Sequence, residues 1–211
     1  MIRNYGIIRE AAARVAKAAE SSTDALRQGR VEQEPAFTDR MLGAIEEAMQ
    51  DFESKGVVWQ AKTLTNLGRN AQEKHFGADF AGVLSVNLPG FIVQKGFLAQ
   101  AKLIEPNHGF SRDEFERLKE QCALMLKLTP DSFIFLYSKG GVAVIPAISV
   151  VSSEPRNPHE FYSRSISRFY EEHFESFIGD ARINEPSTQA LENLRRTWEA
   201  RRLLYLEARA G

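Results

Sequence analysis

The sequence predicts an α/β protein in which a mixed β-sheet is covered by helices on both sides. Three observations favour this class. Apolar residues recur at helical spacing near both ends of the chain, short β-branched and aromatic runs fill the middle, and one helical pattern separates those runs. Helices and strands in this order are typical of a sheet that packs between layers of helices.

The composition is that of an ordinary folded domain, which excludes collagen-like, low-complexity and strongly acidic disordered chains. The chain has 211 residues, 43% of them hydrophobic and 26% charged, and a formal net charge of −1. Its single cysteine, Cys122, excludes a disulfide framework and a cysteine-rich zinc site. No run approaches the ~18 apolar residues that span a membrane, and residues 1–6 lack a secretory signal pattern. We therefore expect a cytoplasmic protein without a membrane partner.

The N-terminal part is expected to form two helices. Residues 1–29 place apolar side chains three and four positions apart, which predicts an amphipathic helix. A polar segment that ends in Pro35 follows. A second apolar face then predicts a helix over 38–53 that begins at Thr38 or Asp39.

The next segment is expected to contribute three strands. Residues 57–64 are rich in β-branched and aromatic side chains, which is typical of a strand. A polar loop over 65–77 follows, and two apolar runs, 78–86 and 91–104, flank the turn signal Asn-Leu-Pro-Gly. The pattern predicts that these two runs pair as a hairpin.

A helix and two further strands complete the expected core. Ser111 begins a helix that runs to about Leu128, and Glu114 completes a capping-box pattern with it. The runs 132–137 and 141–151 are almost wholly apolar, which favours strands that are buried on both faces.

The C-terminal part is expected to be helical again. Residues 158–178 and 186–209 carry aromatic and aliphatic side chains at helical spacing, which favours core or subunit-interface helices. The expected organisation is an N-terminal helical extension over 1–36, an α/β core over 37–155, and C-terminal helices over 156–211 that pack on the core. The apolar faces of the terminal helices are candidate contacts for a homodimer.

One patch of the expected hairpin carries side chains suited to chemistry. Side chains alternate along a strand, so Gln100 and Lys102 share one face, ~6.7 Å apart, while Ala101 points to the helix-covered face. The Asn87–Gly90 turn leaves about ten residues on each arm of the hairpin, so Asp79 can lie opposite Gln100. The sequence therefore predicts a carboxylate, a carboxamide and an ammonium group on one patch.

These groups match the needs of phosphodiester hydrolysis assisted by Mg²⁺ or Mn²⁺. Mg²⁺ prefers oxygen ligands, typically one or two carboxylates together with water and substrate phosphate. Asp79 can supply the charged oxygen, and the Gln100 side chain and the Ala101 backbone carbonyl can supply neutral ones. Lys102 can stabilise the attacking hydroxide or the negative charge of the transition state.

At these residues the chain resembles the PD-(D/E)XK nuclease superfamily. That superfamily has a core of helix, three-stranded meander, helix and strand, with an Asp at the start of the second strand and an acidic residue-x-Lys on the third. The expected order of elements over about 37–151 matches, with Asp79 and Gln100-Ala101-Lys102 at the motif positions. The resemblance implies a restriction-endonuclease-like fold, an Mg²⁺-dependent nuclease activity and DNA as the partner, in restriction, phage defence or repair.

The chain departs from the family pattern at two positions. Ala78 stands where the extended signature has Pro, and Gln100 stands where it has an acidic residue. Gln-x-Lys resembles the variant in Mrr-type restriction endonucleases, which also favour Gly-x-Asp, as in Gly77-Ala78-Asp79. The second departure removes one carboxylate from the expected metal site.

A replacement carboxylate is expected from one of several glutamates. The superfamily often adds a Glu from the first core helix, for which Glu46 and Glu47 are the candidates. Glu73, in the polar loop before Asp79, is a further catalytic and metal-binding candidate, and Glu34 is a remoter one. The sequence does not choose among them.

Two observations leave other interpretations open. Gln60-Ala61-Lys62 repeats the motif on the first expected strand, without a preceding strand that carries an Asp, so the pattern also occurs by chance. Asp79 and Lys102 can instead form a cross-strand salt bridge worth ~0–1 kcal/mol. The protein would then be a catalytically inactive binding or assembly subunit with the nuclease fold.

The last expected helix is locally basic. Its basic residues are Arg195, Arg196, Arg201 and Arg202. Pairing with nearby glutamates on a solvated face is the simpler interpretation, and contact with DNA phosphates is the alternative.

Overall fold

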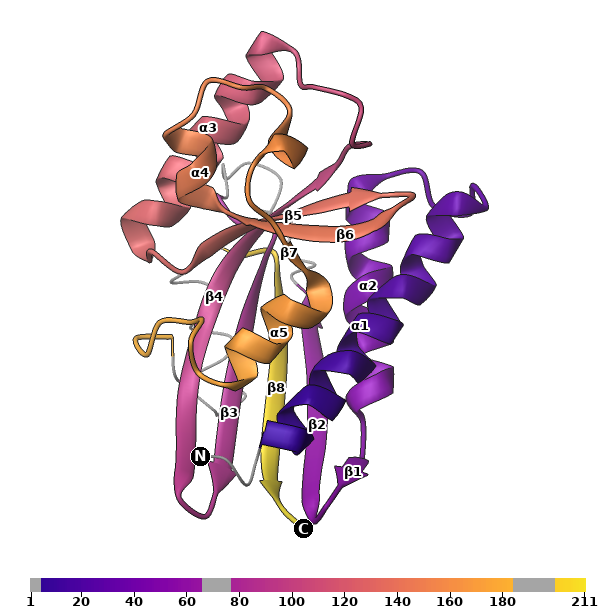
Figure 1. The fold of residues 1–211 in the computed structure, drawn as a ribbon, viewed down its shortest axis with the longest axis vertical. Coiled ribbons are helices and arrows are strands. Elements are labelled where there is room, and N and C mark those ends of the chain that lie inside the picture. The colour runs from indigo at the N-terminus through magenta and orange to yellow at the C-terminus, as the bar shows by residue number, and fades with distance from the viewer. Residues whose placement is uncertain (1–4, 66–76, 184–199) are drawn as a thin grey trace.

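The computed structural model describes residues 5–65, 77–183 and 200–211. The strands are β1 (Phe52–Ser54), β2 (Val57–Thr65), β3 (Phe80–Leu88), β4 (Phe91–Leu103), β5 (Ser132–Ser138), β6 (Gly141–Pro146), β7 (Arg164–Ser165) and β8 (Arg202–Ala210). They form one mixed sheet in the order β1-β2-β8-β3-β4-β5-β6-β7 (Figure 1).

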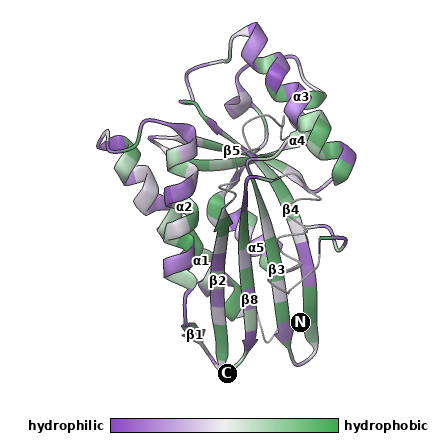
Figure 2. Cartoon of the chain, turned by 180° about the vertical axis from the view of Figure 1, so that it is seen from behind, coloured by the Kyte–Doolittle hydropathy of each residue, from purple (hydrophilic) through white to green (hydrophobic). Residues whose placement is uncertain are grey.

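Helices cover both faces of this sheet, which confirms the expected α/β class. The helices are α1 (Tyr5–Arg27), α2 (Glu34–Met49), α3 (Arg112–Leu128), α4 (Ala147–Val151) and α5 (Ile166–Phe174), with a 3₁₀ turn at Pro158–Glu160. One hydrophobic cluster joins α1, α2 and α5 to the sheet, and a second joins α3 and α4 to its other face. Figure 2 shows α3 and α4 from behind, beside the upper part of the sheet.

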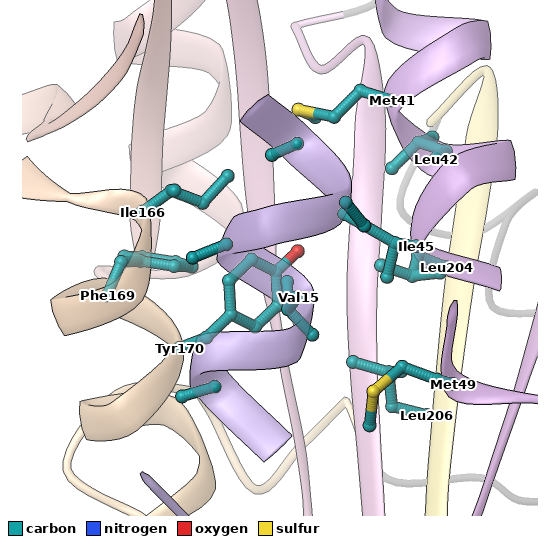
Figure 3. Packing of buried hydrophobic residues seen from close by; sticks show 14 of the residues in the cluster. Val15, Met41, Leu42, Ile45, Met49, Ile166, Phe169, Tyr170, Leu204 and Leu206 are labelled. Atoms are coloured by element: carbon teal, nitrogen blue, oxygen red, sulfur yellow. The ribbon is translucent and has the colours of Figure 1, made fainter. Parts of the chain in front are cut away.

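The larger cluster is where the two ends of the chain meet. Val15 of α1, Ile45 of α2 and Tyr170 of α5 converge on Leu204 and Leu206 of β8 (Figure 3). All five side chains are almost fully buried. The apolar spacing that predicted helices over 1–29, and over the part of 158–178 that α5 occupies, therefore faces the core.

The second helix begins earlier than the sequence predicted. α2 starts at Glu34 rather than near Thr38, with Gln33 as its N-cap and Pro35 in its first turn. Proline suits that turn because its fixed φ is helical and its missing N–H would have no helical partner there. The Thr38 hydroxyl instead donates to the Glu34 carbonyl within the helix, at 3.0 Å. Glu34 therefore belongs to a helix and not to a linker.

The hairpin and the helix that follows it are confirmed. β3 and β4 pair antiparallel around Gly90, whose φ of 75° is readily adopted by glycine. Ser111 and Glu114 form the expected capping box at the start of α3. α3 then returns the chain so that β5 pairs parallel with β4. β5 is buried along its whole length, as its apolar sequence predicted.

The expected three-stranded meander is interrupted by the C-terminal strand. β2 pairs antiparallel with β8, and β8 pairs parallel with β3, so β8 lies between β2 and β3. The predicted helix over 186–209 is therefore wrong for residues 202–209, and residues 184–199 lie outside the described ranges. Residues 203–206 are all buried, and strand pairing on both edges overrides the helix propensity of this apolar run.

Two other predicted elements are shorter than expected. The strand predicted over 141–151 ends at Pro146, which has no N–H for the ladder, and α4 follows. The helix predicted over 158–178 is reduced to α5, because the Ser165 side chain caps it by accepting the Arg168 N–H at 3.2 Å. Within the described ranges, none of the helices is long and apolar enough to cross a membrane.

Candidate active site

The candidate site lies where β4 extends beyond the start of β3. The N–H groups of Ala101 and Leu103, on the same edge of β4, lie past the last backbone pair of the hairpin. Two carboxylates accept these N–H groups: Asp79 Oδ2 from Ala101 at 3.0 Å, and Glu34 Oε2 from Leu103 at 3.1 Å. Because backbone donors require partners, the part of β4 that extends beyond β3 helps to hold both carboxylates in place.

Asp79 contacts Gln100 across the hairpin, as the count of residues along the two strands predicted. The Gln100 Nε2 group donates to Asp79 Oδ2 and more weakly to the Ala101 carbonyl, at 3.4 Å. Gln100 is only 2% exposed, and its Oε1 atom has no hydrogen-bond partner. A buried acceptor without a partner costs free energy, so this oxygen is poised to bind a donor or a cation.

Lys102 pairs with Glu34 rather than with Asp79. The Lys102 Nζ atom lies 3.5 Å from Glu34 Oε1, and both side chains are partly buried. Burial raises the pKa of Glu34; Lys102 and the Leu103 N–H oppose the rise, and the negative charge of Asp79 adds to it. Two carboxylates thus lie close enough to repel each other beside one ammonium group. An additional cation would relieve that repulsion.

Gly77, two residues before Asp79, packs closely against α3. A Cβ atom on Gly77 would lie 3.0 Å from Leu124 Cβ and 3.2 Å from the Gln121 carbonyl oxygen, so only glycine passes here without displacing α3. The Asp79 N–H then donates to the Ala99 carbonyl at 2.8 Å, next to the first pair of the hairpin. The glycine of the Gly-x-Asp sequence is therefore explained by its close packing against α3.

Cys122 of α3 is buried within the second hydrophobic cluster. Burial raises the pKa of its thiol to about 12, which keeps the thiol protonated at neutral pH. Chemistry at this site therefore depends on oxygen and nitrogen groups.

The candidate glutamates for the site lie in different parts of the structure. Glu46 accepts the Thr63 N–H of β2 at 3.1 Å, and Glu47 is exposed on α2. Glu73 lies outside the described residues. The glutamate that the fold brings beside Lys102 is Glu34, the remotest of the candidates. Recognising that a proline favours the first helical turn could have placed Glu34 on the helix.

One residue near the site was expected on a basic helix, where it would pair with glutamates or contact DNA phosphates. Arg202 begins β8, and its N–H donates to the Asp79 carbonyl at 3.2 Å. Its guanidinium binds both oxygens of the Asp39 carboxylate. The local pattern around Arg202 is basic and helical in spacing, so only the long-range pairing of β8 reveals this position. Arg195 and Arg196 lie outside the described residues.

The oxygen atoms at this end of β4 are of the kinds that a hard divalent cation binds. Glu34 and Asp79 supply carboxylate oxygens, and Gln100 Oε1 and the Ala101 carbonyl supply neutral ones. The unpaired Gln100 oxygen is the observation that carries this fit. Across residues 5–65, 77–183 and 200–211, no group of three or more His, Cys, Asp or Glu side chains could hold a metal ion. The set therefore combines two carboxylates with neutral oxygens.

Comparison with known proteins gives no family assignment. No family model matches the chain, and neither the curated proteins nor the solved structures give a significant match. The case for a function therefore rests on the residues at this end of β4.

Proposed function

We propose that this protein is an Mg²⁺-dependent nuclease that hydrolyses phosphodiester bonds of DNA, with a restriction-endonuclease-like core of the PD-(D/E)XK kind. One observation carries the proposal: Glu34, Asp79, Gln100 and Lys102 converge on the open edge of β4, and Gln100 Oε1 is buried there without a partner. A buried polar atom without a partner calls for an explanation, and a cation bound beside two carboxylates would supply one at Gln100.

Each residue has a distinct role in this proposal. Asp79 and Glu34 would hold the metal through their carboxylates, and Gln100 Oε1 and the Ala101 carbonyl would complete the protein ligands. When bound, the metal ion polarises the scissile phosphate and acidifies a water molecule. Lys102 supplies a fixed positive charge where negative charge develops on the phosphate. The 3.5 Å contact with Glu34 orients the ammonium group of Lys102.

Gln100 also favours a second candidate function. An amide in place of a carboxylate lowers the negative charge of the site, which fits a nuclease fold retained as a catalytically inactive binding or assembly subunit. The two candidates differ in a single measurable property, because only the first predicts cleavage.

The test compares two lysines that lie in the same local sequence. Lys102 and Lys62 each end a Gln-Ala-Lys triplet, but Lys62 is exposed on β2. Purified protein is incubated with supercoiled plasmid, linear duplex and single-stranded DNA, with Mg²⁺ or Mn²⁺. We expect cleavage that EDTA abolishes, that Lys102→Met lowers roughly 10²-fold or more, and that Lys62→Met leaves unchanged. An inactive wild type, or equal rates in both variants, would contradict the proposal.

Metal binding separates an inactive site from a wrongly assigned one. Mn²⁺ binding is measured by electron paramagnetic resonance for the wild type, Glu34→Gln and Glu47→Gln. We expect Glu34→Gln to weaken binding and Glu47→Gln, an exposed change on the same helix, to leave it unchanged. Absence of both binding and cleavage would contradict the nuclease and favour the inactive subunit, whereas binding without cleavage would contradict catalysis alone.

A further inference from the structure

The two carboxylates of the site come from separate elements that must be held at a fixed spacing. Asp79 precedes β3, and Glu34 is the first residue of α2. The N-cap of α2, Gln33, makes no side-chain capping bond. The first turn of a helix has unpaired N–H groups and frays easily, so Glu34 depends on an anchor for this turn as well as on its bond to the Leu103 N–H.

Arg202 contacts both of these elements. Its backbone N–H donates to the Asp79 carbonyl at 3.2 Å. Its guanidinium Nη2 donates to Asp39 Oδ2 at 3.0 Å and to the Pro35 carbonyl at 3.4 Å, and Nε donates to Asp39 Oδ1. Pro35 and Asp39 both belong to the start of α2, where Glu34 lies. One residue thus joins the strand start that carries Asp79 to the helical turn that carries Glu34.

We propose that Arg202 is the positioning residue that sets the spacing of the Glu34 and Asp79 carboxylates. The inference rests on the proposed function, because the spacing matters for a shared metal ion. Arg suits the task since its planar fork binds one carboxylate through two nitrogens and still reaches a carbonyl. Lys offers a point charge without that geometry. The Arg202 side chain is 12% exposed, whereas that of Asp39 is 53% exposed, so Asp39 can be changed with little disturbance of the core.

The Leu103 amide reports the position of Glu34 without any metal. Its N–H donates to Glu34 Oε2 at 3.1 Å, so its hydrogen-exchange rate rises if the first turn of α2 moves away. The amide of Phe135, inside the sheet, serves as the reference for global unfolding. The matched control is Arg182→Lys, which alters another Arg–Asp pair, that of Arg182 with Asp180.

The experiment measures Leu103 exchange and Mn²⁺ affinity in Arg202→Met, Arg202→Lys, Asp39→Ala and the control. We expect Leu103 to exchange about tenfold faster or more in Arg202→Met and Asp39→Ala, with Phe135 unchanged. Mn²⁺ affinity should fall ~10–100-fold, as for other groups that orient metal ligands. Arg202→Lys should recover part of both losses, and the control should match the wild type.

The outcomes separate this inference from the proposed function. Wild-type Leu103 exchange in Arg202→Met and Asp39→Ala would overturn the positioning role, whatever the metal measurements show. Faster exchange of Phe135 in parallel with Leu103 would also overturn it, since Arg202 would then act only on global stability. If the wild type binds no Mn²⁺, the proposed function fails, and the Leu103 exchange still decides what Arg202 does.

Discussion

Lys95 and Lys102 lie on the same strand, β4, but their ammonium groups have different kinds of partner. Lys95 is 8% exposed, and its Nζ atom donates to the Ser176 carbonyl at 2.8 Å and to the Ser176 hydroxyl at 3.2 Å. Lys102 lies 3.5 Å from Glu34, beside an amide oxygen of Gln100 that has no partner. Lys95 thus donates to neutral oxygens, whereas Lys102 pairs with a carboxylate.

The acidic groups around the two lysines differ in the same way. Near Lys95, Asp131 accepts the Gly179 N–H at 2.7 Å, and Asp180 accepts from Thr129 at 2.8 Å and from Arg182. Near Lys102, two carboxylates share the edge of β4. Both regions are rich in charge, so charge alone does not mark a functional site. The distinguishing property is the balance of charge: Asp79 adds to the raised pKa of Glu34, whereas Arg182 holds the pKa of Asp180 low.

The largest expected difference between the regions is in catalysis. Asp79→Asn should lower DNA cleavage roughly 10²–10³-fold, because it removes a charge that the site preorganises. Asp131→Asn, in the Lys95 region, should leave the rate near that of the wild type. Initial rates of plasmid nicking, at equal concentrations of folded protein, check this difference. Similar losses in both variants would remove the distinction between the two regions.

Acid sensitivity should come from the Lys95 region. His173 is fully buried; its Nδ1 lies 3.0 Å from the Ile178 carbonyl, and burial lowers its pKa to about 4, with Lys95 adding to the effect. In the unfolded state the His173 side chain binds a proton near pH ~6.5, whereas in the folded state it stays neutral until the pH falls towards about 4. Up to about 3 kcal/mol of stability is therefore present above that pH and lost as the pH falls towards about 4.

Denaturant unfolding at several pH values tests this dependence. His173→Gln should flatten the fall in the free energy of unfolding between pH ~6.5 and ~4. His108→Gln, a change at an exposed histidine, should keep it. An unchanged slope in His173→Gln would assign the acid sensitivity to other groups.

The next effect, at Lys95, is on the free energy of unfolding and not on the rate of cleavage. Lys95→Met should lower the free energy of unfolding by about 1–3 kcal/mol, because the partly buried Ser176 carbonyl loses a charged donor. Ser176 has a φ of 71°, a conformation that its contacts must hold in place. Urea titration measures the loss, and Lys139→Met at an exposed turn is the control. A variant as stable as the wild type would show that Ser176 does not depend on Lys95.

The smallest expected effect is at Gln100. Gln100→Glu should lower the free energy of unfolding of the metal-free protein by about 1 kcal/mol, because it loses the bond to Asp79 and adds a like charge. Added Mn²⁺ should raise the melting temperature of this variant more than that of the wild type. Gln94→Glu, an exposed change on β4, is the control. Equal shifts in both variants would contradict a cation site at Gln100.

The elements that were predicted correctly depend on local signals. The hairpin follows from a Pro-Gly turn between apolar runs, and α3 follows from a capping box at Ser111. Counting along the hairpin also predicted that Asp79 lies opposite Gln100, since side chains alternate with a period of two.

The parts that were missed depend on contacts between distant residues. Ala61 of β2 pairs with Leu206 of β8, and no local pattern announces that partnership. The place of Glu34 depends on where α2 begins, and helix boundaries are poorly marked when the cap makes no side-chain bond. The site was therefore predictable where one hairpin builds it and not where α2 and β8 complete it.

The central position of β8 imposes an order on biosynthesis. β2 and β3 leave the ribosome early, but the slot between them is filled only when residues 202–210 have been translated. At about 5–20 residues per second, that interval is on the order of ten seconds. During it, two strand edges that will later face β8 are open to wrong pairing. We therefore expect the nascent chain to need protection at these two edges until β8 has been synthesised.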